Sequence, residues 1–142
     1  MCIILNPKTQ LSEHFSLTEM VSKNDPCHDV LLKKLPVHVY ENLKKVCSIL
    51  EEFRKILDCP ISVNSALRST SHNIAVGGVT NSYHCHGLAV DFRTNKTALS
   101  NFQLLSSAYN LKPYKSGNYL VAKNDKFKLL LYPTFIHMQL QK

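Results

Sequence analysis

The sequence predicts an α+β domain in which helices pack on a central antiparallel sheet. Apolar residues recur at helical spacing in the N-terminal half, whereas the C-terminal half contains runs that alternate between apolar and polar residues. A chain of 142 residues is long enough for one sizeable core, and we find neither internal repeats nor a linker rich in glycine, proline or serine. We therefore expect residues 1–142 to form a single domain.

The helix signals come first. Ser16 and Glu19 have the spacing of a capping box, which predicts a short helix directly after Ser16. Pro36 can occupy the first turn of a longer helix that ends near Asp58. The apolar residues at helical spacing in this second helix are Leu43, Val46, Leu50, Phe53 and Leu57.

The later part of the chain predicts strands, with one more helix among them. Residues 61–66 have the composition of a strand, and the glycine pair at 77–78 indicates a turn. Thr97 is a suitable cap for a helix through Tyr109. Residues 119–123 and 127–132 then predict a hairpin, which a further strand follows.

The stretch from Ser82 to Asp91 contains the most informative residues. It sets His84 and Asp91 seven positions apart, and a third candidate, His137, lies in an alternating run at 135–140. Two histidines and one aspartate are ligands that zinc accepts, and three protein ligands leave a fourth position open for water. This composition is typical of a hydrolytic zinc site.

Strand periodicity indicates how these ligands are presented. If residues 87–92 form a strand, Asp91 shares one face with Gly87 and Ala89, and apolar residues occupy the other face. The two small residues would then leave room for a substrate beside the metal. The closing alternating run presents His137 in the same way.

Taken together, these elements resemble metallopeptidase family fifteen, the zinc D-Ala-D-Ala carboxypeptidases and endopeptidases with the hedgehog/DD-peptidase fold. The resemblance is closest to the small phage and bacterial members, and it covers nearly the whole chain. The matching elements are His14-Phe-Ser-Leu-Thr-Glu at 14–19, the segments 60–69 and 73–78, Ser-x-His-x-x-Gly-x-Ala-x-Asp at 82–91, and Phe-Ile-His at 135–137.

The resemblance implies a role for several residues. His84, Asp91 and His137 would bind one zinc ion, Arg68 would bind the substrate carboxylate or stabilise an oxyanion, and Ser82 would lie near the substrate backbone. A guanidinium suits the first of these substrate roles, because it pairs with a carboxylate through two hydrogen bonds and stays charged at any working pH. The implied substrates are stem peptides of bacterial peptidoglycan, cut next to D-alanine or at another stem bond.

The sequence departs from the family pattern at the general base. The resemblance implies an acidic residue three positions before His137, where this chain has Thr134, and the position two after it, often Asp in relatives, is Gln139. Neither side chain takes up a proton near neutral pH. The remaining candidates are Asp125, if the predicted hairpin folds over the site, and His86. The alternative to an enzyme is therefore a catalytically silent module that keeps the metal and binds the cell wall or has a structural role.

His86 is also an alternative metal ligand. If the loop is extended there, His84 and His86 point to the same side, and either can reach a metal. The resemblance favours His84. We expect the other histidines to be polar surface or core residues: His14, His28, His38 and His72.

The composition limits the partners. The net charge is +7, but the lysines are dispersed, so we expect a solvated surface or attraction to an anionic cell wall, and no binding to nucleic acid. No run has transmembrane length, and residues 1–5 are too short for the apolar core of a signal peptide. We expect a monomer made without a signal peptide in the bacterial or host cytoplasm and acting at the wall, with no membrane contact.

The cysteines indicate neither a metal site nor a disulfide framework. There are five of them, an odd number, and none forms a Cys-x-x-Cys pair. We expect buried free thiols, as in proteins of a reducing compartment.

Overall fold

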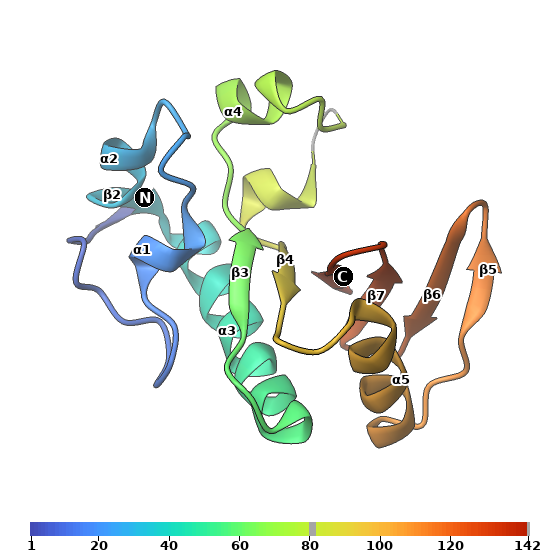
Figure 1. The fold of residues 1–142 in the computed structure, drawn as a ribbon. Coiled ribbons are helices and arrows are strands. Elements are labelled where there is room, and N and C mark those ends of the chain that lie inside the picture. Colours follow the sequence, from blue (N-terminus) through green and yellow to red (C-terminus); the bar gives the residue numbers. More distant parts are fainter. Residues whose placement is uncertain (80–81, 142) are drawn as a thin grey trace.

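The computed structural model describes residues 1–79 and 82–141 and confirms the α+β fold (Figure 1). A six-stranded antiparallel sheet has the order β3-β4-β8-β7-β6-β5, and β1 and β2 form a separate pair. In chain order the elements are β1 (Cys2–Ile4), α1 (Leu17–Met20), α2 (His28–Leu31), β2 (Lys34–Pro36), α3 (Val37–Leu57), β3 (Ser62–Ser65), α4 (Thr70–Ala75), the 3₁₀ helix η1 (Tyr83–His86), β4 (Ala89–Arg93), α5 (Ala98–Ala108), β5 (Tyr114–Ser116), β6 (Tyr119–Lys123), β7 (Phe127–Leu131) and β8 (Ile136–Leu140).

Strand β8 lies inside the large sheet, between β4 and β7. Its buried side chains alternate with half-buried ones, as the sequence predicts, because successive side chains of a strand point to opposite faces. Ile136 and Met138 are fully buried, together with Phe92 of β4. His137 and its cross-strand partner Asp91 therefore project from the other face.

The long helix α3 covers the buried face of the sheet. Phe53 in α3 packs against Phe92 and Phe127, with ring centroids 5.7 and 5.2 Å apart. The helix begins one residue later than expected, since Pro36 is its N-cap, and it ends at Leu57, followed by the C-cap Asp58 with a left-handed φ of 53°. The sheet face that points away from α3 is thereby left to carry polar residues.

The shorter predicted elements are also present, with small changes in length. Glu19 closes the capping box of α1 by accepting a hydrogen bond from the Ser16 N–H at 3.2 Å. Thr97 caps α5 by accepting one from the Ser100 N–H at 3.1 Å. The structure adds elements that the sequence did not indicate, namely β1, β2, α2, α4, η1 and β5.

Gly87 and Ala89 do not leave the room for substrate that strand periodicity suggested. Ala89 is fully buried. Gly87 has φ +69°, and a Cβ there would lie 2.9 Å from the Val39 carbonyl oxygen, so glycine is needed because α3 passes close by. Both residues are small because they pack.

All five cysteines are free, but only Cys47 is buried, so the expectation of buried thiols is right for that residue alone. Burial, with smaller effects from Glu51 and Glu19, raises the pKa of the Cys47 thiol to about 12. Within the described residues, no helix has the length and apolar character needed to cross a membrane.

A buried carboxylate ties the N-terminal segment to the rest of the fold. Asp25 is only 3% exposed and accepts hydrogen bonds from the Ser69 N–H at 2.9 Å, the Ser69 hydroxyl at 2.6 Å and the Cys27 N–H at 2.9 Å. Burial by itself raises the pKa of Asp25, but these hydrogen bonds and the nearby His72 outweigh it and lower the pKa. Asp25 therefore fixes the chain next to Arg68.

Replacing Asp25 tests this anchor. We expect Asp25→Asn to lower the free energy of unfolding by about 1–3 kcal/mol, because buried donors lose a charged acceptor. Since the native pKa is lowered, the contribution is complete above the unfolded pKa of about 3.9 and is lost as the pH falls through the native value. Urea unfolding at pH 7 and at lower pH measures both effects. Exposed Asp29→Asn is the control, and an equal stability of the two variants would contradict the prediction.

Candidate metal centre

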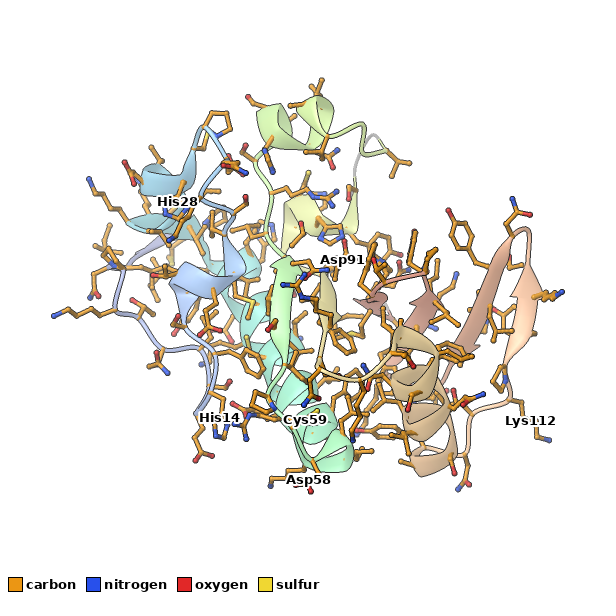
Figure 2. All side chains as sticks on the ribbon, viewed as in Figure 1. His14, His28, Asp58, Cys59, Asp91 and Lys112 are labelled. Carbon is orange, nitrogen blue, oxygen red and sulfur yellow. The ribbon has the colours of Figure 1, made fainter. Side chains whose placement is uncertain are left out.

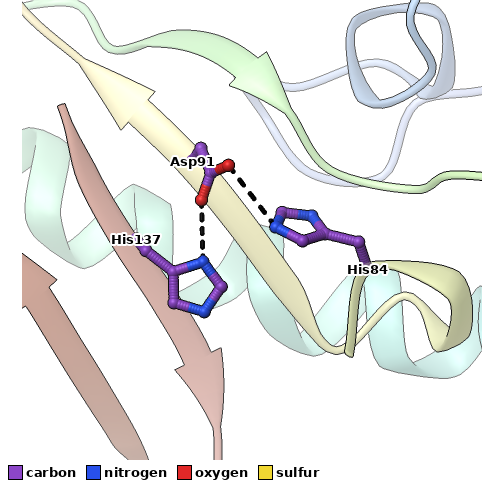
Figure 3. A group of neighbouring side chains, drawn as sticks. All are labelled: His84, Asp91 and His137. Carbon is purple, nitrogen blue, oxygen red and sulfur yellow. Dashed lines mark hydrogen bonds and ion pairs between the residues drawn. The ribbon is translucent and has the colours of Figure 1, made fainter. Parts of the chain in front are cut away.

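Three of the predicted residues form one cluster. His84 comes from η1, Asp91 from β4 and His137 from β8, and each offers a ligand atom within 4.8 Å of the others (Figure 3). Figure 2 shows Asp91 near the middle of the molecule, whereas His14 and His28 lie toward the N-terminal side. The structure thus brings together the three predicted ligands.

The backbone explains why these side chains meet. Asp91 and His137 are directly opposite each other in the β4–β8 pair, so both project from one face. His84 is held in η1, where the Ser82 hydroxyl accepts a hydrogen bond from the His84 N–H at 3.2 Å. The His84 carbonyl in turn accepts from the Arg68 N–H at 3.1 Å.

The hydrogen bonds of His84 fix its tautomer. Nδ1 lies 2.7 Å from the carbonyl oxygen of Ala66, which can only accept, so Nδ1 carries the proton. Nε2 lies 3.4 Å from Asp91 Oδ2, where it can donate a hydrogen bond to the carboxylate or, once it has lost its proton, offer a lone pair to a metal. In many metal-binding histidines the nitrogen that does not bind the metal donates to a backbone carbonyl, as Nδ1 of His84 does to Ala66.

His137 faces Asp91 with its other ring nitrogen, Nδ1, whereas His84 faces it with Nε2. Its Nδ1 lies 2.8 Å from Asp91 Oδ1, and its Nε2 lies 2.9 Å from Gln139 Oε1. When Nδ1 binds a metal, Nε2 carries the proton and donates it to the Gln139 amide oxygen. Gln139, which the sequence presented only as a missing acid, is therefore an orienting partner of the ligand.

Asp91 is the negative centre of the cluster. It is 8% exposed, and burial by itself raises its pKa, but hydrogen bonds and charge interactions with His137 and His84 prevail and lower the pKa to about 2. The carboxylate is ionised at neutral pH. Arg68 adds a positive charge, with Nη2 3.7 Å from Asp91 Oδ2.

The cluster fits zinc. Its donor set of two imidazole nitrogens and a carboxylate is one that zinc accepts, and each imidazole directs one ring nitrogen toward the centre. Ligand atoms about 2.0–2.2 Å from a tetrahedral zinc ion lie about 3.4 Å from one another. The separations here, 3.4 Å for His84 Nε2 to Asp91 Oδ2 and 2.8 Å for His137 Nδ1 to Asp91 Oδ1, need little adjustment.

The predicted bases lie elsewhere. η1 is a 3₁₀ helix, in which residues two apart point in different directions, so the extended loop assumed for His84 and His86 is wrong. His86 is outside the cluster. Asp125 is exposed and precedes Leu130, the strand partner of His137, by five positions, or roughly 16 Å of extended chain. The hairpin extends the sheet and does not fold over the site, which leaves Asp125 too distant for proton transfer.

Tyr132 is a neighbour of the cluster that the sequence did not indicate. Its ring stacks on Phe135 with centroids 4.6 Å apart, and it follows Leu130 by two positions, so it shares the face of His137. Burial, followed by Tyr119 and the Asp91 charge, raises the pKa of Tyr132, against a smaller opposite effect of Arg68. Tyr132 is thus a neutral phenol, able to donate a hydrogen bond at neutral pH. An aromatic residue in the turn before the last ligand is its only sequence signal.

Two further residues contact Arg68, and the sequence reasoning assigned neither of them a role. The Ser65 hydroxyl accepts from Arg68 Nε at 3.1 Å, and Asn73 Oδ1 accepts from Nη1 at 3.2 Å. Ser65 lies opposite Asp91 in the β3–β4 pair, next to a register shift after Val63. Arg68 is therefore held beside the cluster from two sides.

Comparison with known proteins gives one match. A family model described as Peptidase M15 matches residues 13–127, most of the chain. The match includes His84 and Asp91 and ends before His137, which the geometry of the cluster adds. Neither the curated proteins nor the solved structures that were compared include a match to this chain.

Metal analysis tests the ligand set. We expect one zinc ion per purified chain, lost in His84→Ala and in His137→Ala because each removes a third of the protein ligands. His86→Ala is the matched control and should keep its zinc. Full zinc occupancy in His137→Ala would exclude His137 from the metal site. Loss of zinc in His86→Ala but not in His84→Ala would show that His86 is the ligand instead of His84.

The orienting role of Gln139 predicts opposite effects for two substitutions. Gln139→Leu removes the acceptor of the His137 proton and should lower zinc affinity about 10–100-fold. Gln139→Asp supplies a charged acceptor and should raise it. Competition with a chromogenic chelator measures both affinities, with the exposed Gln103→Leu as control. Equal affinity in all three variants would show that Gln139 has no influence on the ligand.

Proposed function

The chain belongs to the peptidase M15 family and is a zinc-dependent peptidase, and we propose that it hydrolyses stem peptides of bacterial peptidoglycan. The bond would lie next to D-alanine, as in a D-Ala-D-Ala carboxypeptidase, or elsewhere in the stem peptide, as in a related endopeptidase. The observation that supports this proposal most is Arg68, a fixed cation 3.7 Å from the zinc ligand Asp91. A peptide with a carboxylate close to the cut bond matches that arrangement.

The chemistry divides between the metal and the chain. His84, Asp91 and His137 would hold the zinc ion, which would supply polarisation of a carbonyl group and a water molecule with its pKa lowered to about 7. Arg68 binds the substrate carboxylate or the oxyanion through its planar fork of donors. Tyr132 offers a neutral donor on the same face.

The net charge favours a wall substrate, and the burial of Ser82 limits how this residue could contact it. The net charge of +7 attracts the protein to anionic wall polymers, so its site of action would be the cell wall. Ser82 is 5% exposed, and its hydroxyl already caps η1. Ser82 would therefore contact a substrate either through its backbone or through a second hydrogen bond of its hydroxyl group.

A second candidate function rests on the position of the missing base. Thr134 has no acidic group, and among the described residues no further carboxylate joins the three ligands. General-base catalysis contributes about 10²–10⁴-fold, so an enzyme without it hydrolyses slowly. The limiting case is a silent module that binds the wall and cuts nothing.

Incubation with peptidoglycan separates the two functions. We expect slow release of stem-peptide fragments, identified by mass, and complete loss of release with a chelator. Thr134→Glu should raise the rate toward the roughly 10²–10⁴-fold that a general base contributes, while Thr134→Gln, of the same size but without a base, should not. Tight binding of wall fragments with no release by wild type or by Thr134→Glu would establish the binding module instead.

A further inference from the structure

We propose that Asn73 is a positioning residue that fixes the guanidinium of Arg68 beside the zinc ligands, and that residue 78 is glycine to make room for it. The proposal rests on the role of Arg68 in the proposed function. Asn73 lies on α4, outside the metal cluster, and neither Asn73 nor Gly78 offers a zinc ligand.

The amide of Asn73 has a hydrogen-bond partner at each end and cannot be turned around. The residue is 4% exposed; its Oδ1 accepts from Arg68 Nη1 at 3.2 Å, and its Nδ2 donates to the Val79 carbonyl at 2.8 Å. A guanidinium only donates and a carbonyl only accepts, so each end of the amide has one possible partner. Asn73 thereby links Arg68 to the turn after α4.

Arg68 needs such a link because its side chain is long. A free arginine side chain has many rotamers, and holding it in one of them costs entropy that substrate binding would otherwise have to overcome. Here Nε is held by the Ser65 hydroxyl and Nη1 by Asn73, and two contacts fix the plane of the guanidinium. Nη2 also lies 3.7 Å from Asp91 Oδ2, and the N–H groups of Nη1 and Nη2 that point away from Asn73 and Asp91 are left for a substrate oxygen.

Gly78 is required for space. A Cβ at residue 78 would lie 2.1 Å from Asn73 Oδ1 and 2.7 Å from its Cγ, closer than any real contact. The Gly78 N–H also donates to the Asn73 carbonyl at 2.8 Å, so the two residues are held together. Gly77 differs, because it has φ +74° and its Cβ would meet nothing within 4 Å. Glycine is thus needed at position 77 for its backbone conformation and at position 78 for lack of space.

A double-mutant cycle tests the coupling. Asn73→Ala and Gly78→Ala should each lower kcat/KM on a stem peptide about 10–100-fold with zinc content unchanged, because a misplaced reacting group costs this much. The double variant should be no worse than Asn73→Ala, since the clash of Gly78→Ala is with the Asn73 side chain. Gly77→Ala is the matched control: it strains the backbone and should lower Tm without lowering kcat/KM. Additive losses, or an equal loss in Gly77→Ala, would overturn the proposal.

A second cycle separates positioning from general stability. In an Arg68→Ala background, Asn73→Ala should reduce kcat/KM no further, whereas a purely structural role would reduce it again. Asn73→Asp keeps an acceptor for Nη1 and should retain more activity than Asn73→Ala.

A readout independent of catalysis distinguishes failure of this inference from failure of the proposed function. In ¹⁵N spectra of the zinc-loaded protein, the Arg68 Nε–H signal, assigned by its absence in Arg68→Ala, should be slow to exchange with water. It should exchange faster in Asn73→Ala and Gly78→Ala and stay unchanged in Gly77→Ala. An unchanged signal in Asn73→Ala would refute the positioning role even if the wall is cut, and a faster one would support it even if no stem peptide is hydrolysed.

Discussion

The pairing of β4 with β8 is the constraint on which the rest of the site depends. Asp91 and His137 face each other because the two strands are in one particular register, and a shift by one residue would turn His137 into the core. What prevents that shift is the apolar half of the same alternation, since Ile136 and Met138 must stay in the hydrophobic core. The burial that stabilises the domain is therefore also what places two of the three ligands.

Charge balance is the second requirement. An ionised carboxylate as buried as Asp91 is tolerable only with close partners, and it has two imidazoles and a guanidinium around it. Arg68 in turn is held by Ser65 and Asn73, and the residue after it by Asp25. These contacts connect the N-terminal segment to the metal cluster, so residues from distant parts of the sequence together position the guanidinium of Arg68.

The periodic parts of the chain could be predicted from the sequence, and the parts set by tertiary contact could not. The length of α3 and the alternation in β8 follow from local spacing of apolar residues, and the types and order of His84, Asp91 and His137 predicted the cluster that the structure brings together. Strand periodicity predicts the face on which a residue lies, but not which parts of the fold cover that face. The expectation that Gly87 and Ala89 leave room for a substrate was wrong for this reason. The compact turn of η1 and the contacts of Asn73 depend on segments that only the folded chain brings together.

The place of β8 in the sheet has a consequence for how the protein is made. This strand follows all the others in the sequence, yet it lies between β4 and β7 and joins two parts of the sheet. While a ribosome is still adding residues before Ile136, β4 and β7 each present an edge without its neighbour, and such edges are prone to pair with other chains. The same delay leaves His84 and Asp91 without His137, so the candidate metal site is complete only after β8 has been added.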